Sequence, residues 1–487
     1  MIKNLSIVLL ILLNCFKSCA QDALDSAFLL PDTVTAFTLE NFYAVLLQFH
    51  PVVNQIRLLQ NNAQAEIRMA RGAFDPKLAA TFNNKEFNQK DYYTKWTTSL
   101  SLPSWFPVDP KVGIEQNSGA FIDPENSVPG TDQFKQVFAG LSVPLGRGLF
   151  TDDRRAAVKT AKLFAQMTEA EQIKLINKIL LESSKDYWQW YYSYYNLRLY
   201  EVNTSIAIEL FRRVKLSHSH GEASGVDTLQ AKITMQQRLV ERQEAYLDFA
   251  NTSIRISSYL WNSQGQPVQL SSNVAPTLAH GQDELLSASG LESLTARAKQ
   301  NHPELVKLHL KLSQLDVERR LAVEYLKPRL DLNYSFLNQP ITPQGSLNML
   351  SIGNNYKFGL DFSMPLLFRK ERSKLTQTKI KIESTKFELT QAEREIINQI
   401  NMTFNQLKNT SLVLEQQRGI AKNYERLLRA ELLNLENGEA DLFKINLQQE
   451  KLIQSQSKLL KIRSEYEKLK AMLYWAAGVK DLNFDHE

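Results

Sequence analysis

An internal duplication constrains the fold of this chain more than any other feature. When the sequence is shifted by 252 positions, residues 39–78 align with residues 291–330 without a gap. Twelve of the 40 aligned pairs are identical, and they include His50 with His302, Pro51 with Pro303, and Pro76 with Pro328. This period is far longer than that of a short solenoid repeat. We therefore expect two equivalent halves arranged around one object.

Residues 1–20 predict a signal peptide. Lys3 gives a positive start, residues 7–13 are apolar, and Ser18-Cys19-Ala20 is a small-residue cleavage site. The alternative is lipidation at Cys15 or Cys19. Because both cysteines of the chain lie in this segment, the exported chain would contain none. That excludes disulfides, thiolate metal sites and cysteine nucleophiles.

Composition excludes two further classes. After the signal, no apolar run approaches the roughly 20 residues that a membrane-spanning helix needs, so an inner-membrane helical protein is not expected. The chain has 57 basic and 52 acidic residues, a net charge of +5. A balance so close to neutral gives no reason to expect nucleic acid as a partner.

Prolines divide the start of each half into two predicted helices. A short helix, 39–48 or 291–300, precedes a His-Pro pair, because proline is well placed in a first helical turn. A second helix, 51–73 or 303–325, ends before another proline, which pushes the preceding residue out of helical conformation.

Alternation of apolar and polar residues then predicts β-strands. The second half has two such stretches, 329–338 and 356–366, and the first half has counterparts at 77–87 and 134–144. The insert between the first-half pair holds two further candidate strands, 95–102 and 111–121. Alternation of this kind is also what a membrane barrel strand requires.

Each half continues with a long helix and a returning helix. Residues 150–217 contain neither glycine nor proline, and residues 368–437 contain only Gly419. At 1.5 Å rise per residue, each predicted helix is about 100 Å long. The returning helices are expected at 226–261 and 442–477. A coiled-coil-like seam is formed by Leu389, Ile396, Ile400, Leu407 and Leu414.

Taken together, these features resemble the TolC-like outer-membrane efflux family over essentially all of the exported chain. The motifs that carry the resemblance are the helix starts His50-Pro51 and His302-Pro303, the strand ends Pro144-Leu145 and Pro365-Leu366, the basic helix starts Arg154-Arg155 and Arg369-Lys370, the turns Gly221-Glu222-Ala223 and Gly438-Glu439-Ala440, and the closing run Tyr474-Trp475-Ala476-Ala477-Gly478. Each motif alone is weak, but their doubled order is specific.

The resemblance implies a mainly α-helical fold with a β-barrel part. Long coiled-coil hairpins would form an α-barrel, and four strands per chain would contribute to a twelve-stranded barrel in a homotrimer. Independently, four strands cannot close a barrel, and lipid tolerates no open sheet edge. The expected organisation is signal 1–20, first repeat 21–262, linker 263–290, second repeat 291–478 and tail 479–487.

The implied function is a passive outer-membrane exit duct of a tripartite efflux or type I secretion system. Its helical part would lie in the periplasm, and its partners would be an adaptor (membrane fusion) protein and an inner-membrane transporter. We expect no enzymatic activity, cofactor or metal. The alternative is an exported coiled-coil scaffold or adhesin without a pore, which would not need the paired strands. The sequence names neither the cargo nor the transporter.

The resemblance also implies a gate at the ends of the helical hairpins, the periplasmic tip. Its candidate residues are Gly221, Glu222, Asp227, Gly438, Glu439, Asp441 and Lys444. Asp227 and Lys444 each lie six residues after a turn glycine, and we expect them to form an opposite-charge latch. The alternative is that these are solvated residues favoured at a helix start. The expected strand-to-helix junctions are Pro76, Pro144, Pro328 and Pro365.

Two further motifs invite a functional interpretation. The aromatic residues between Asp186 and Tyr195 could form a ligand platform or a membrane belt, but packing against neighbouring helices is the favoured interpretation. His218 and His220 flank the first turn and could bind metal, although no third ligand is evident. His50 and His302 precede prolines, and we expect a structural role at the helix start.

Overall fold

The computed structural model describes residues 35–123, 125, 127, 136–221, 223–271, 273–277, 288–337, 355–436 and 442–479. The expected signal peptide and four candidate tip residues, Glu222, Gly438, Glu439 and Asp441, lie outside these ranges. The chain forms two compact units, and each draws on both halves of the sequence. The first unit takes residues from 1–57, 172–303 and 393–487, and the second from 58–171 and 304–392.

The helices follow the predicted order closely. They are α2 (Leu39–Phe49), α3 (Pro51–Arg71), α4 (Asp153–Ser219), α5 (Gly225–Ser257), α6 (Ala288–Asn301), α7 (Pro303–Glu324), α8 (Arg369–Glu436) and α9 (Leu442–Ala476). A 3-10 turn, Gly72–Phe74, follows α3 before Pro76. The first returning helix ends at Ser257 and not at Trp261, because Trp261 pairs with Pro267 in an isolated bridge.

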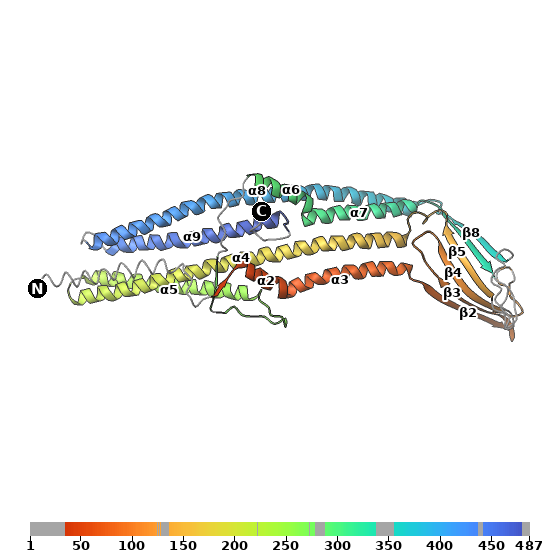
Figure 1. The fold of residues 1–487 in the computed structure, drawn as a ribbon, viewed down its shortest axis with the longest axis horizontal. Helices are drawn as coiled ribbons and strands as arrows, with labels where there is room; N and C mark the ends of the chain where they lie inside the picture. The colour runs from red at the N-terminus through yellow and green to blue at the C-terminus, as the bar shows by residue number, and fades with distance from the viewer. Residues whose placement is uncertain are drawn as a thin grey trace. The chain divides into compact units, whose positions relative to one another are not determined.

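Six strands form one antiparallel sheet, and this corrects the expectation of four strands per chain. They are β2 (Lys77–Phe87), β3 (Lys90–Ser101), β4 (Asp109–Ser118), β5 (Gln136–Pro144), β7 (Arg329–Leu337) and β8 (Tyr356–Ser363). Their order in the sheet is β2-β3-β4-β5-β7-β8 (Figure 1). The two strands of the first-half insert, β3 and β4, pair with each other and with β2 and β5. Strands β3 and β4 are therefore inner strands of the same sheet.

A second, two-stranded sheet was not predicted. Strand β1 (Thr35–Phe37) pairs in parallel with β6 (Val274–Pro276), which lies inside the expected linker 263–290. The Tyr187 hydroxyl of α4 lies 2.7 Å from the Phe37 carbonyl and 2.9 Å from the Thr277 carbonyl. One buried tyrosine thus holds both strand ends against the long helix.

Aromatic residues of α4 form the main core of the first unit. Tyr187 and Trp190 are fully buried, and they pack with Phe42 of α2 and Ile256 of α5. The ring centroids of Phe42 and Tyr187 are 5.9 Å apart. Packing against other aromatic rings and against aliphatic side chains is therefore the role of this motif.

A second core of the same unit follows the predicted seam of α8. Ile400, Leu407 and Leu414 are buried and pack against α6 and α9. Figure 1 shows α9 running back along α8, as α5 runs back along α4. The spacing of seven residues continues to Leu428, which packs against Leu452 of α9. The seam explains why a helix of 68 residues remains regular here.

Candidate functional site

The six-stranded sheet of the second unit has one apolar face. Directly paired residues lie on the same side of a sheet. The register pairs Leu78 with Leu100 and Leu100 with Val112, and it pairs Leu330 with Phe362 at the opposite edge. Large exposed side chains on this face are Leu78, Phe82, Trp96, Val112, Ile114, Leu141, Tyr356, Phe358, Leu360 and Phe362. A face this apolar requires a covering phase or partner.

The opposite face of the same sheet is polar. One straight row of paired residues runs across all six strands on this side: Lys77, Ser101, Lys111, Gly140, Ser335 and Lys357. Phe138 also lies here, against Gly113, where a Cβ atom would approach the Phe138 ring to 2.5 Å. The Lys111 ammonium lies 5.9 Å from the centre of that ring. The sheet therefore has one mainly apolar face and one mainly polar face.

A charged junction joins the β3–β4 turn to the start of α4. The Arg154 guanidinium donates to both oxygens of Asp109, at 3.2 and 3.0 Å, and to Asp152. Asp152 caps the helix, since its Oδ1 accepts a bond of 2.8 Å from the Arg155 N–H. The Arg155 hydrogen bonds and the charges of both arginines outweigh burial and lower the pKa of Asp152. The sequence indicated the basic helix start but gave no sign of its partner Asp109.

The four junction prolines lie at strand ends. Pro76 and Pro328 directly precede β2 and β7, Pro144 is the last residue of β5, and Pro365 follows β8 by two residues. The Pro328 carbonyl accepts a hydrogen bond from Arg147, and a Cβ on Gly146 would collide with it. Gly146 therefore has a steric reason to lack a side chain.

The end of the first hairpin is a glycine turn followed by a capped helix. Gly221 has a φ of +80°, which is the left-handed conformation typical of a glycine that ends a helix. Ser224 and Asp227 form a capping box, in which the Asp227 N–H donates to Ser224 Oγ and the Ser224 N–H donates to Asp227 Oδ2. The Ser224 hydroxyl, which donates to Asp227 Oδ2 at 2.7 Å, and the Ser224 N–H lower the pKa of the Asp227 carboxyl. Asp227 thus has a local structural role besides the expected latch.

The sequence also singled out Lys444, His218 and His50. Lys444 is an exposed residue of the first turns of α9. The His218 ring lies 2.8 Å from the Ala223 carbonyl, so it participates in the turn. Within the described ranges, no cluster of three or more histidine, cysteine, aspartate or glutamate side chains is arranged to hold a metal ion. His50 accepts a bond of 3.2 Å from the Val52 N–H through Nδ1, as expected for a residue that starts a helix.

A buried ion cluster links the two hairpins, and the sequence did not single it out. Arg238 of α5 is 3% exposed and donates to Glu241 of its own helix at 2.6 Å. Its other terminal nitrogen donates to Glu450 of α9 at 2.5 Å. Burial alone would lower the pKa of Arg238, but the bonds and charges of both glutamates raise it above its usual value. Charged residues are common on long helices, so no spacing distinguished this arginine.

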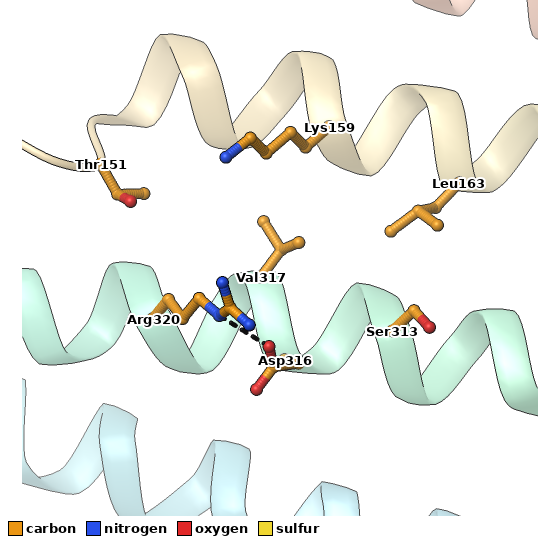
Figure 2. A pocket seen from close by; sticks show the side chains of 7 residues that line it. All are labelled: Thr151, Lys159, Leu163, Ser313, Asp316, Val317 and Arg320. Atoms are coloured by element: carbon orange, nitrogen blue, oxygen red, sulfur yellow. Dashed lines mark hydrogen bonds and ion pairs between the residues drawn. The ribbon is translucent and has the colours of Figure 1, made fainter.

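A cavity of about 340 Å³ lies between the start of α4 and the second half of α7 in the second unit (Figure 2). Its lining is Thr151, Lys159, Leu163, Ser313, Asp316, Val317 and Arg320. Asp316 accepts bonds of 2.7 Å from both Arg319 and Arg320. The Arg319 bond and the charges of both arginines lower the pKa of Asp316. A carboxylate held ionised in this way is a poor general base.

None of the described helices has a stretch long and apolar enough to cross a bilayer.

Comparisons with known proteins agree with the geometry. Residues 294–479 match the family model described as outer membrane efflux protein. The search of curated proteins found no match. Solved structures with a similar fold include the CmeC outer membrane channel of Campylobacter jejuni, with 12% identity, a TM-score of 0.62 and coverage of 90% of this chain and 85% of that chain.

Two further outer membrane proteins have a similar fold. The outer membrane protein VceC of Vibrio cholerae has 14% identity and a TM-score of 0.61, with coverage of 90% of this chain and 96% of that chain. The MtrE outer membrane channel of Neisseria gonorrhoeae, in its open state, has 12% identity and a TM-score of 0.60, with coverage of 90% and 88%. Residues 294–479 thus match the outer membrane efflux protein family, and the chain as a whole has the fold of these outer membrane proteins.

Proposed function

We propose that this chain is the outer-membrane exit duct of a tripartite efflux or type I secretion system. The single observation that carries the proposal is the two-faced sheet. A mainly apolar face suits the hydrocarbon of a membrane, and the polar face behind it suits a water-filled lumen. The chain itself catalyses no reaction in this proposal. It conducts cargo passively, and a periplasmic adaptor and an inner-membrane transporter supply selection and energy.

Closure of the duct requires more than one copy. One sheet leaves two unpaired edges, which lipid does not tolerate. We propose a homotrimer, in keeping with the family. The apolar side chains exposed on α8, such as Phe387 at 68% and Leu412 at 58%, support lateral contacts between helices of neighbouring copies.

The test is ion conduction by the purified chain. Reconstituted in planar lipid bilayers, it should give discrete conductance steps, and native mass measurement in detergent should give three copies. A protein that associates with vesicles through its apolar face, yet never conducts, would support the scaffold alternative.

We further propose that the duct is gated at the hairpin ends. The candidate latch is Asp227 with Lys444, two residues of opposite charge at equivalent offsets from the turn glycines. Their attraction would be screened by salt because both side chains meet solvent. Asp227→Asn and Lys444→Gln should therefore raise single-channel conductance at low salt, with a smaller effect at high salt. Because the Asn amide oxygen can still accept the bond from the Ser224 N–H, Asp227→Asn keeps the capping box.

The Arg238–Glu450 pair gives this gate a second, salt-insensitive tie. It joins α5 to α9, and Arg238 is almost fully buried, so ions in solution screen the pair little. Glu450→Gln should increase the open fraction at both low and high salt. The matched control is Glu209→Gln, which removes ion pairs of 2.8 and 2.7 Å to Arg212 and Arg213 within α4 alone. If both variants change gating equally, the link between hairpins is not the cause.

A further inference from the structure

The six strands of this chain determine how wide its membrane wall is. The resemblance to the efflux family implied four strands per chain, but the described sheet has six. We propose that three copies close an eighteen-stranded wall, in which β8 of one copy pairs antiparallel with β2 of the next. This inference rests on the proposed function for the number of copies. The number of strands, their faces and their register come from the sheet itself.

The extra strands β3 and β4 have the same two faces as their neighbours. Trp96 of β3 and Ile114 of β4 lie on the apolar face and are 44% and 45% exposed. Their sequence neighbours Lys95 and Glu115 lie on the polar face. A hairpin that served only as a water-exposed or buried extension would not need this alternation. Both strands therefore belong to the lipid-facing wall.

The turn between β3 and β4 supports the same conclusion. It is held by the bidentate bond from Arg154 to Asp109, which ties β4 to the start of α4. Ser104 in this turn donates its N–H to Asp109 and its hydroxyl to the Val108 carbonyl. The β3–β4 hairpin is thus anchored to the start of α4.

The two edges of the sheet are compatible with each other. All five neighbouring pairs are antiparallel, and the number of strands is even. It follows that β2 and β8 run in opposite directions, and the edge of one copy can pair antiparallel with the other edge of the next. Both edges expose apolar side chains, such as Phe82 of β2 and Phe358 of β8, at 66% and 57%.

The register predicts the pairing at this joint. The straight row that starts at Lys77, the first residue of β2, ends at Lys357, six residues before Ser363 at the end of β8. If Ser363 pairs with Lys77 of the next copy, each copy adds a stagger of six residues over six strands. One residue per strand is the stagger of an eight-stranded barrel with a shear of 8 and a tilt of about 36°.

This pairing also keeps the faces together. It places Phe358 opposite Phe82 of the next copy on the apolar face, and Lys357 opposite Asn83 on the polar face. A shift by one residue would put apolar side chains into the lumen along the whole joint. Since barrel diameter grows roughly linearly with strand number, the wall would be about 1.5 times as wide as one of twelve strands.

The first experiment asks which strands face lipid. Ile114→Cys and Glu115→Cys are labelled with a fluorescent maleimide in the trimer reconstituted in lipid vesicles, and quenching by lipids with a spin label in the acyl chain is measured. Phe358→Cys and Lys357→Cys serve as the reference pair in β8. We expect strong quenching at 114 and 358 and at least several-fold weaker quenching at 115 and 357.

Two results separate the inference from the proposed function. Quenching at 358 without quenching at 114 would overturn the eighteen-stranded wall but leave a membrane channel. The absence of quenching at both positions would overturn the proposed function itself.

The second experiment tests the joint between copies. Lys357→Cys combined with Asn83→Cys should form a disulfide under mild oxidation and give covalent trimers, because directly opposed Cβ atoms are about 4.5–5.5 Å apart. Lys357→Cys with Asn84→Cys is the control, since position 84 lies on the other face. Covalent species that stop at the dimer would indicate a twelve-stranded wall of two copies, and equal cross-linking of both pairs would overturn the predicted register.

Discussion

The two long helices have nearly the same length, but within the first unit they pack in different cores. Helix α4 has 67 residues and α8 has 68. The middle of α4 buries Tyr187 and Trp190 against α2, α5 and the small sheet, whereas α8 buries single residues at intervals of seven, such as Leu407. Two helices of equal length can therefore be held by different kinds of side-chain packing. A wide aromatic core binds several short elements, and a narrow aliphatic seam binds one returning helix and α6.

The largest effect is expected in the aromatic core. Trp190→Ala removes a fully buried indole that lies 5.8 Å from the Tyr187 ring and 6.5 Å from the Phe37 ring. We expect a loss of about 3–5 kcal/mol of stability, because the rigid surroundings cannot fill the cavity. Thermal unfolding in detergent measures it. Lys178→Ala, an exposed change on the same helix, should be nearly silent, and an equal loss there would refute the packing argument.

Truncating a side chain in the aliphatic seam of α8 should reduce the stability of the protein less. Its effect should be confined to α8 and α9. Leu407→Ala removes a side chain that is 3% exposed, and a loss of about 2–5 kcal/mol is expected. Amide hydrogen exchange should show faster exchange in α8 and α9, with little change in α2. If α2 opens as readily in this variant as in Trp190→Ala, the two cores are not independent.

The glycines that follow α4 and α9 differ in how closely other residues surround them. Gly221 and Gly478 both have positive φ, at +80° and +67°. A Cβ at 478 would lie 2.7 Å from His302 and Pro303, whereas the site at 221 has no neighbour within 4 Å. Gly221→Ala should therefore cost only the backbone strain of about 1–2 kcal/mol, and Gly478→Ala should cost more. Melting temperatures of the two variants give the order, and a reversed order would contradict the steric account.

The smallest effect should come from titration of His50. This histidine packs near the rings of Tyr259 and Trp261 at the edge of the aromatic core, and burial lowers its pKa below 6.5. Because the folded state binds the proton less well, its contribution to stability is complete above pH 6.5 and is lost as pH falls toward the folded pKa. The melting temperature should decline more between pH 7.5 and 5 in the wild type than in His50→Asn, in which the amide can still accept from Val52. If the melting temperature falls equally with pH in both proteins, groups other than His50 cause the acid sensitivity.

Much of the fold could be predicted from the sequence because its signals are local. His50-Pro51 and His302-Pro303 start helices where proline is tolerated, and β2 begins at Lys77 as predicted, directly after Pro76. Long runs without glycine or proline gave α4 and α8 within a few residues. The seam of α8 was also predictable, because a spacing of seven residues implies one buried stripe.

The candidate site was less accessible to sequence reasoning. The resemblance implied four strands per chain, and the two candidates of the insert could be assigned to the wall only once their pairing was known. The latch formed by Asp227 and Lys444 stays a prediction. Arg238 and Glu450 were missed because they lie 212 positions apart, and no local pattern relates one to the other.

The sequence by itself therefore determined the order, type and length of the main elements, since propensity, proline position and hydrophobic period act over a few residues. The tertiary structure alone decided which strands pair, which side chains the aromatic residues of α4 contact, and which arginine is buried between hairpins. Those choices depend on atoms brought together from distant parts of the chain. Their free energy comes from burial and pairing, which no local stretch of sequence encodes.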